Sequence, residues 1–392
     1  MEREHIMAEL LKDNLSIEKI SILASSIAEY GAQYNISFDE DFFQQQLIAC
    51  CPAHGAEHWQ GLSLMQRIRA AAQALYSTMP QQEGADAVLT SLRGNNQLSS
   101  WLSLVCCEYV AIHQNLSLEQ GLAYLQKMTE FFSAEFAIRH FIIKRPKETL
   151  AVLMTWLEHD NHHVRRLISE GTRPRLPWGT RLSTFIDQPE LVMPLLLILR
   201  DDDADYVRRS VANHLNDIAK DHPQLIITTA QQWLADEALA PLNNLQRKQR
   251  VKLIRHACRT LFKQGEPAVM ALFGYQPAHD VNCHLSSDQL MVPFAGHFEF
   301  EMTLEKNTTH PNQLMVDYVM HFQKANGKQT PKVFKWLDRS LTDKTLEKVS
   351  RKHSFKKIST RKYYPGTHRL EVMVNGITKA QIEFELLADG DG

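Results

Sequence analysis

The sequence lacks any run of about 20 consecutive apolar residues, the length that a membrane-spanning helix requires. Its first 13 residues, MEREHIMAELLKD, contain six charged side chains, too many for the apolar segment of a secretory signal. Hydrophobic residues make up 44% of the chain and charged residues 22%, as in ordinary globular proteins. We therefore expect a soluble protein of the cytoplasm that does not bind membranes.

Cysteine is also scarce, and the six cysteines form neither a CxxC pair nor a spaced disulfide framework, which favours a reducing compartment. Three histidines lie close together in the sequence, at His159, His162 and His163. No acid or cysteine nearby completes a known zinc-ligand spacing. We therefore expect neither a metal ion nor another cofactor.

The net charge of −2 conceals an uneven distribution of charge. Residues 1–134 carry a net charge of −8, whereas residues 135–266 carry +4 and residues 267–392 carry +2. Within the last region, residues 324–369 hold 14 lysines and arginines and only three acids. Such basic regions are typical of proteins that bind a polyanion, although a solvated basic surface would have the same composition.

A short pattern, Ile/Val-Arg-Arg/His, recurs four times in the first part of the chain. It occurs as IRHFI from Ile138, VRRLI from Val164, VRRSV from Val207 and IRHAC from Ile254. The last three copies are 43 and 47 residues apart, close to the period of HEAT-type helix pairs. Such pairs stack into a solenoid with a concave wall. The pattern predicts a mainly α-helical, HEAT-like solenoid domain over residues 1–275.

From about residue 281 the apolar residues recur with the period of a strand. HFEFEMTLEK alternates between apolar and polar residues, and two further alternating runs flank Asn375-Gly376. Asn-Gly between alternating runs is the strongest short signal for a β-hairpin. Roughly seven short strands predict a C-terminal antiparallel β-sandwich over residues 281–392.

The helical spacing also places side chains on faces. In the third copy Arg209, Asn213 and Asp217 form a polar stripe. Going back by 43 residues puts Glu170 opposite Asn213 on the neighbouring helix. Because neighbouring helices pack about 8–10 Å apart, we expect Glu170 and Asp217 to face one groove flanked by arginines. The residues alone leave open whether these acids are ion-pair partners or reactive groups.

Four ordered stretches resemble the AlkC branch of the HEAT-repeat DNA glycosylases, relatives of AlkD that remove alkylated bases from DNA. They are FFSAEFAIRHFI, NHHVRRLISEGTRPRLPW, DYVRRSVANHLNDIAKDHP and IRHACRTLFKQG. The resemblance covers essentially the whole chain and implies that the C-terminal domain is immunoglobulin-like. The polar segment from Asp236 to Arg250 differs, because it is long for a link between repeats.

The resemblance implies a monofunctional glycosylase of base excision repair that hydrolyses the N-glycosidic bond of cationic alkylated bases such as 3-methyladenine and 3-methylcytosine. It implies double-stranded DNA as the partner, with carboxylates that stabilise the oxocarbenium ion and position water. We expect a monomer, because a clamp around DNA needs only one copy. By position the catalytic residues are Glu135, Glu170, Asp217 and Trp178. The arginines of the repeats and their polar neighbours are the expected DNA contacts: Arg139, His162, His163, Arg165, Arg166, Arg173, Arg175, Arg208, Arg209, Asn213, Arg255 and Arg259.

Two other functions fit the same residues. A HEAT-repeat protein could bind damaged or branched DNA without releasing a base, and its binding would then survive loss of Glu170 and Asp217. A scaffold for a protein partner would show no salt-dependent affinity for DNA. The basic stretch of residues 324–369 contains Trp336, Tyr363 and Tyr364 and is a candidate for a second DNA contact.

Overall fold

The computed structural model describes residue 11 and residues 13–51, 56–98, 100–306, 312–341, 345–358 and 361–388. Most of the N-terminal stretch considered for a signal sequence lies outside the described residues. So do positions 342–344 and 359–360 of the basic stretch. None of the described helices combines the length and apolar character that crossing a membrane requires.

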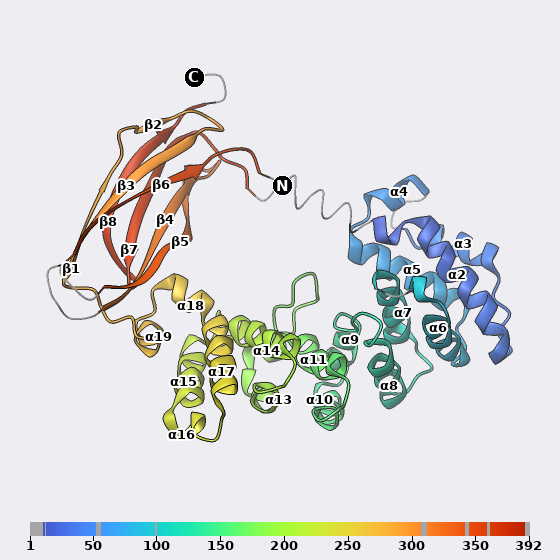
Figure 1. Cartoon of the computed structure of the whole chain (residues 1–392). Coiled ribbons are helices and arrows are strands. Elements are labelled where there is room, and N and C mark those ends of the chain that lie inside the picture. The colour runs from blue at the N-terminus through green and yellow to red at the C-terminus, as the bar shows by residue number, and fades with distance from the viewer. Residues whose placement is uncertain are drawn as a thin grey trace. The chain divides into compact units, whose positions relative to one another are not determined.

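Helices fill the first part of the chain (Figure 1). Their bounds are α2 Ile17–Gly31, α3 Glu40–Ala49, α4 Ala56–Gly61, α5 Leu64–Thr78, α6 Glu83–Gly94, α7 Trp101–Ile112, α8 Leu118–Met128, α9 Ile138–Lys144, α10 Pro146–Thr155, α11 His162–Gly171, α12 Ser183–Asp187, α13 Met193–Leu199, α14 Asp205–Ile218, α15 Pro223–Leu234, α16 Asp236–Leu239, α17 Asn244–Ala257, α18 Arg259–Gln264 and α19 Pro267–Leu272.

Local sequence signals account for where several helices begin. Ser117 and Gln120 form a capping box at the start of α8, so two otherwise unpaired backbone N–H groups are bonded. Helix α10 begins at Pro146, where the missing proline N–H leaves no hydrogen bond unmade. The polar segment from Asp236 contains the short helix α16 and the start of α17.

The chain forms two compact units. The helices up to α17 make one unit, apart from Ile227–Gln231 of α15. The other unit contains those five residues, α18, α19 and the strands. The last two helices therefore group with the strands, and the domain boundary expected between residues 275 and 281 stays a prediction.

Within the helical unit, α11 packs against α13 and α14, and α14 packs against α17. Helices α11 and α14 lie along one side of the stack, and α10 and α13 lie along the other (Figure 1). The apolar side of α14 is buried and consists of Val207, Val211, Leu215 and Ile218. Burying each such side chain contributes about 1.5–3 kcal/mol. This packing fixes the polar side of α14 against α11.

The strands form two sheets of a sandwich. The first sheet has the order β1 (Val281–Ser286), β3 (His297–Lys306), β6 (Thr345–Ser354). The second has the order β2 (Met291–Val292), β8 (Ile377–Leu386), β7 (Gly366–Val374), β4 (Asn312–Gln323), β5 (Gln329–Leu341). Described pairings are antiparallel except the short one between β2 and β8. The predicted fold class, a mainly helical part followed by an antiparallel sandwich, is confirmed.

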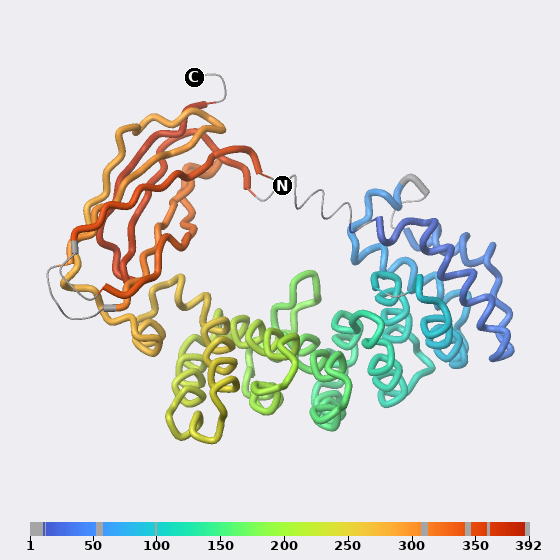
Figure 2. The backbone as a smooth tube through the Cα atoms, viewed as in Figure 1, coloured from blue at the N-terminus to red at the C-terminus, as the bar shows by residue number. Residues whose placement is uncertain are grey.

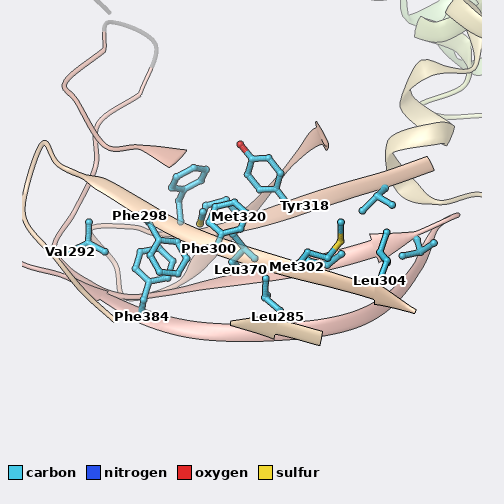
Figure 3. Close-up of a cluster of buried hydrophobic side chains, with 14 of the residues drawn as sticks. Leu285, Val292, Phe298, Phe300, Met302, Leu304, Tyr318, Met320, Leu370 and Phe384 are labelled. Atoms are coloured by element: carbon cyan, nitrogen blue, oxygen red, sulfur yellow. The ribbon is translucent and has the colours of Figure 1, made fainter. Parts of the chain in front are cut away.

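Aromatic and aliphatic side chains from both sheets fill the space between them (Figure 3). Phe298 of β3 stacks on Phe384 of β8 with ring centroids 3.8 Å apart. The expected hairpin turn joins β7 to β8, with Asn375 at φ 46° and Gly376 at φ 80°. Glycine is required at the adjoining end of α18, because a Cβ on Gly265 would lie 2.7 Å from the Cα of Gly376.

Candidate active site

A cavity of about 210 Å³ opens on the helical unit where the loop after α11 meets α7, α11, α14 and the turn before α9. Its wall combines two carboxylates with five aromatic rings. The lining residues are Trp101, Phe132, Ser133, Glu135, Phe136, Arg166, Glu170, Arg173, Leu176, Pro177, Trp178 and Tyr206. The structure therefore brings three of the four predicted catalytic residues to one cavity: Glu135, Glu170 and Trp178.

Arg166 occupies the space between the two carboxylates of this cavity. Its Nη1 lies 2.5 Å from Glu135 Oε2, and its Nη2 lies 3.6 Å from Glu170 Oε1. The guanidinium also lies over the ring of Tyr206, 4.8 Å from the ring centroid, and donates to the hydroxyl of Ser133. The cavity thus already holds a planar, delocalised cation between two acids and above an aromatic face.

Glu170 is 5% exposed, and both of its oxygens are bonded. Oε1 accepts a 2.6 Å hydrogen bond from Arg173 Nη1, and Oε2 accepts one of the same length from the hydroxyl of Ser210 on α14. Charge-assisted bonds of this kind are short and strong, so they fix the orientation of the carboxylate. Glu170 is therefore an ion-pair partner, which is one of the two interpretations that the sequence left open. It also lines the cavity, as a reactive group would.

Asp217 does not line the cavity, contrary to the expectation that it faces the same groove as Glu170. It is 1% exposed and accepts a 2.8 Å bond from Arg173 Nε at one oxygen and a 2.9 Å bond from Lys220 Nζ at the other. Arg173, itself 6% exposed, therefore bridges Asp217 and Glu170. In this arrangement Asp217 reaches the cavity only through the arginine.

Trp178 lies in the loop between α11 and α12, which extends away from the helices as a narrow green hairpin (Figure 2). Its side chain is 61% exposed, and its backbone has a φ of 63°, an uncommon value for a residue other than glycine. The bond from Leu182 N to Pro174 O closes the loop. This loop therefore presents a large aromatic side chain to solvent at the mouth of the cavity.

Arg139 of α9 anchors both ends of that loop. Nε donates to the carbonyl of Thr180 at 2.6 Å, and Nη1 donates to the carbonyls of Gly171 and Arg173 at 2.9 and 2.8 Å. Burial lowers the pKa of Arg139 to about 10, so the side chain stays charged at neutral pH. Arg139 is only 1% exposed, and its expected contact with DNA stays a prediction.

Glu135 lies in the turn before α9, because the helix begins at Ile138. Only the family resemblance assigns a catalytic role to Glu135, and the structure gives its hydrogen-bond partners. The hydroxyl of Ser133 donates to its Oε2 at 2.7 Å, and its backbone N–H donates to the same hydroxyl. These bonds hold the Glu135 carboxylate on the cavity wall opposite α11.

A second cavity of about 310 Å³ adjoins the first and shares Arg166, Glu170 and Tyr206 with it. Its remaining lining residues are polar: Arg209, Ser210, Asn213 and His256. The expected facing of Glu170 and Asn213 is therefore observed. Together the two cavities form one groove along α11, α14 and α17, with an aromatic part and a polar part divided by Glu170.

The four copies of the repeat pattern have their second basic residue in equivalent positions. The residue at the second charged position lines a cavity in every copy: His140, Arg166, Arg209 and His256. The first arginine donates hydrogen bonds to backbone carbonyls in the first three copies. Arg165 and Arg208 bond to carbonyls of the turns before their own helices, and Arg165 also binds Asp202 through both carboxylate oxygens.

The expected DNA contacts differ in how exposed they are, and the set stays a prediction. Arg208 is 7% exposed and Arg173 is 6% exposed, and both are bonded internally. Arg175 is half-buried and pairs with both oxygens of Asp221. Arg255 on α17 and Arg259 at the start of α18 are partly exposed.

The rings of the two neighbouring histidines at the start of α11 pack against each other, with an angle of 32° between their planes. The rings of His162 and His163 are 4.3 Å apart, and both contact Tyr206. Burial, followed by the nearby charges of His162 and Arg166, lowers the pKa of His163. Among the residues that the structure describes, no three His, Cys, Asp or Glu side chains converge as a metal site would require.

Behind Glu170, a fully buried histidine supports the last turn of α11. His214 of α14 donates from Nδ1 to the carbonyl of Ser169 at 3.0 Å. Burial lowers the pKa of His214 to about 3, so the ring is neutral at physiological pH. Because Ser169 precedes Glu170, this bond helps to hold the backbone that carries the acid.

Sequence reasoning missed several residues of the groove. Ser210 and Tyr206 lie four residues apart on α14, on the side that carries Arg209, so the repeat register could have identified them. His256 could have been found as the second position of the repeat pattern. Trp101 and Phe132 could not have been found in this way, because they lie outside the repeat pattern, at the start of α7 and in the turn before α9. The fold brings their ring centroids to 5.2 Å from each other.

Comparison with known proteins gives relatives over nearly the whole chain. Residues 282–388 match the family described as the C-terminal Ig-like domain of the uncharacterised protein YhaZ. The YhaZ protein of Bacillus subtilis (strain 168) is 35% identical over 332 residues, which are 84% of this chain and 89% of that protein. A solved structure, Pseudomonas fluorescens alkylpurine DNA glycosylase AlkC bound to DNA containing an abasic site analog, is 34% identical. It superposes with a TM-score of 0.86 over 96% of this chain and 99% of that one. The chain belongs to the AlkC-type DNA glycosylase family, in the form with a C-terminal Ig-like domain.

Proposed function

We propose that the protein is a monofunctional DNA glycosylase of alkylation repair. It hydrolyses the N-glycosidic bond of cationic alkylated bases, such as 3-methyladenine and 3-methylcytosine, and leaves an abasic site. The observation that carries this proposal is the cavity in which Glu135 and Glu170 face each other across a cation, among aromatic rings. The similarity to a glycosylase structure over 96% of the chain supports the same activity.

The chemistry requires little help at the leaving group, because alkylation at a ring nitrogen makes the base cationic. The enzyme must instead stabilise the sugar, which becomes an oxocarbenium ion as the bond breaks. A carboxylate about 3.5 Å from that cation gains about 5 kcal/mol at an effective dielectric constant of 20. Each ~1.4 kcal/mol expressed in the transition state is about tenfold in rate. Glu135 and Glu170 are the groups that supply this stabilisation.

The two acids have different access to water. The side chain of Glu135 is 14% exposed and that of Glu170 is 7% exposed with both oxygens bonded. We assign Glu135 to orient the attacking water and Glu170 to stabilise the sugar cation. Asp217 contributes through Arg173, whose position it fixes.

Hydrolysis should not be followed by strand cleavage. A lyase step needs an amine nucleophile that attacks the sugar. No lysine is among the described residues that line the two cavities of the groove. The product of the reaction is therefore an intact strand with an abasic site.

Double-stranded DNA is the proposed partner, and the solved relative is itself bound to DNA. The exposed cations of the groove, such as Arg209, are suited to backbone phosphates. The basic stretch of the sandwich carries cation–aromatic pairs, including Arg361 over Phe322 at 4.1 Å, and is proposed as a second contact. One copy provides all the proposed catalytic groups, so we propose that a monomer is active, in the cytoplasm.

Base release from methylated duplex DNA tests the proposal. The wild-type protein should release 3-methyladenine without added metal, and the strand should break only after treatment with alkali. Heat-inactivated protein is the control for spontaneous loss of the labile base. DNA binding without release from any methylated substrate would identify a non-catalytic DNA-binding protein instead.

Trp178 should affect activity without affecting stability. We expect Trp178→Ala to lower the rate of base release about 3- to 30-fold, because a cation held against an aromatic face gains about 0.5–2 kcal/mol. The melting temperature should stay within about 1 °C, since the side chain is 61% exposed. Trp178→Phe, which keeps an aromatic face, should retain most of the rate. A rate for Trp178→Ala equal to that of wild type would remove this residue from the proposed site.

A further inference from the structure

At the N-terminal end of α14, three cationic side chains from two helices converge on one acid. Asp205, the first residue of α14, is bonded by Arg209 Nε at 3.2 Å and by Lys252 Nζ of α17 at 3.2 Å. Arg208 Nη2 lies 3.5 Å away. Four groups with three positive charges and one negative charge leave a local surplus of positive charge.

This cluster adjoins the polar part of the groove. Asp205, Arg209 and Lys252 line a small cavity between α14 and α17. That cavity shares Arg209 and His256 with the cavity that contains Glu170. An extended anion bound along the groove would therefore pass from one to the other.

The exposures of the members show which bonds can exchange. The side chains of Arg209 and Lys252 are 58% and 72% exposed, whereas that of Arg208 is 8% exposed and held by backbone carbonyls. Ion pairs between exposed groups are weak, because water and salt compete for both partners. The two exposed cations can leave Asp205 for another acceptor, and Arg208 stays in place as fixed positive charge.

We propose that this cluster is a seat for a backbone phosphate of DNA, in which Asp205 takes the place of the phosphate while the protein is free. A phosphodiester oxygen accepts the same hydrogen bonds as the carboxylate and carries the same charge. On binding, Arg209 and Lys252 turn from Asp205 to the phosphate. The inference rests on the proposed action on DNA and adds a binding site that includes Lys252.

The carboxylate competes with the phosphate, so its removal should strengthen binding. We expect Asp205→Asn to tighten binding of an unmodified duplex about 3- to 10-fold at low salt, as measured by fluorescence anisotropy. Lys252→Ala should weaken binding and lower the slope of log K against log salt by about one. Glu148→Gln is the matched control, because Glu148 is also exposed in the first turn of its helix, α10. It should leave affinity unchanged.

Other outcomes would overturn the proposal. If Asp205→Asn has no more effect than Glu148→Gln, Asp205 only complements the helix dipole. If a few millimolar inorganic phosphate displaces DNA while neither variant alters the salt slope, the site takes a free anion. These tests use unmodified DNA and no base release. If both substitutions change DNA affinity as expected but the wild-type protein releases no base, the phosphate site stands and the glycosylase activity is excluded. If the wild-type protein releases base but neither substitution changes affinity, the glycosylase activity stands and the phosphate site is excluded.

Discussion

Glu170→Gln should lower the rate of base release by about 100-fold or more while leaving DNA affinity within about threefold of wild type. Glutamine keeps the shape of the side chain and an oxygen that accepts from Arg173 or Ser210. It removes the negative charge that stabilises the sugar cation. A loss of 100-fold corresponds to about 2.7 kcal/mol, roughly half of the electrostatic gain available at an effective dielectric constant of 20. Single-turnover base release and anisotropy with the same duplex measure the two quantities.

Glu108→Gln provides a closely matched control. Glu108 is 2% exposed, and its Oε1 lies 3.0 Å from His140 Nε2 and 3.9 Å from Arg69 Nε, so it is also a buried glutamate of the helical unit with basic neighbours. It lines a different small cavity and does not line the one that contains Glu135 and Glu170. Its substitution should cost stability but change base release less than threefold. Equal losses in the two variants would mean that Glu170 acts through folding stability and not on the reacting sugar.

The sequence predicts the architecture well because its signals are local. The repeat pattern carries the period of the helix pairs, and the buried side of α14 follows from it. Asn375-Gly376 places the β7–β8 hairpin because both residues accept a positive φ. The same register brings Glu170 next to Asn213. The hairpin signal depends on residues that are close in sequence, and the placement of Glu170 depends on the regular spacing of the repeat copies.

The misplacement of Asp217 has a geometric cause. A stripe at positions i, i+4 and i+8 drifts around a helix, because eight residues advance it by about 80° beyond two full turns. Arg209 therefore faces the groove, whereas Asp217 faces inward to Arg173. The drift is small over four residues, and Asn213 lines the groove as expected.

The arginines of the repeat pattern show a second limit of sequence reasoning. Two adjacent arginines point about 100° apart on a helix, and composition does not say which one is exposed. Arg139 and Arg208 donate mainly to backbone carbonyls. Because every residue has a backbone carbonyl, the sequence does not indicate which ones accept these hydrogen bonds. Only the fold reveals that these arginines fix turns and loops.

Arg139→Lys should impair both stability and base release, because one ammonium group cannot replace the guanidinium that bonds three carbonyls. Leaving buried acceptors unpaired costs about 1–3 kcal/mol each, so we expect the free energy of unfolding of the helical unit to fall by about 2–4 kcal/mol. The rate of base release should fall about as far as in Trp178→Ala, since the loop that carries Trp178 loses its anchor.

A double-mutant cycle distinguishes an effect through the loop from a general loss of structure. If Arg139 acts by positioning Trp178, Arg139→Lys should reduce base release less than threefold when Trp178 is already alanine. Arg165→Lys is the matched control, because Arg165 is the equivalent arginine of the next copy and bonds to Asp202 and to turn carbonyls outside the groove. It should lower stability comparably and leave base release nearly unchanged. Additive losses of base release for the two substitutions would show that Arg139 does not act by positioning the loop. Arg139 would then act on the site through Arg173, whose backbone carbonyl also accepts a hydrogen bond from it.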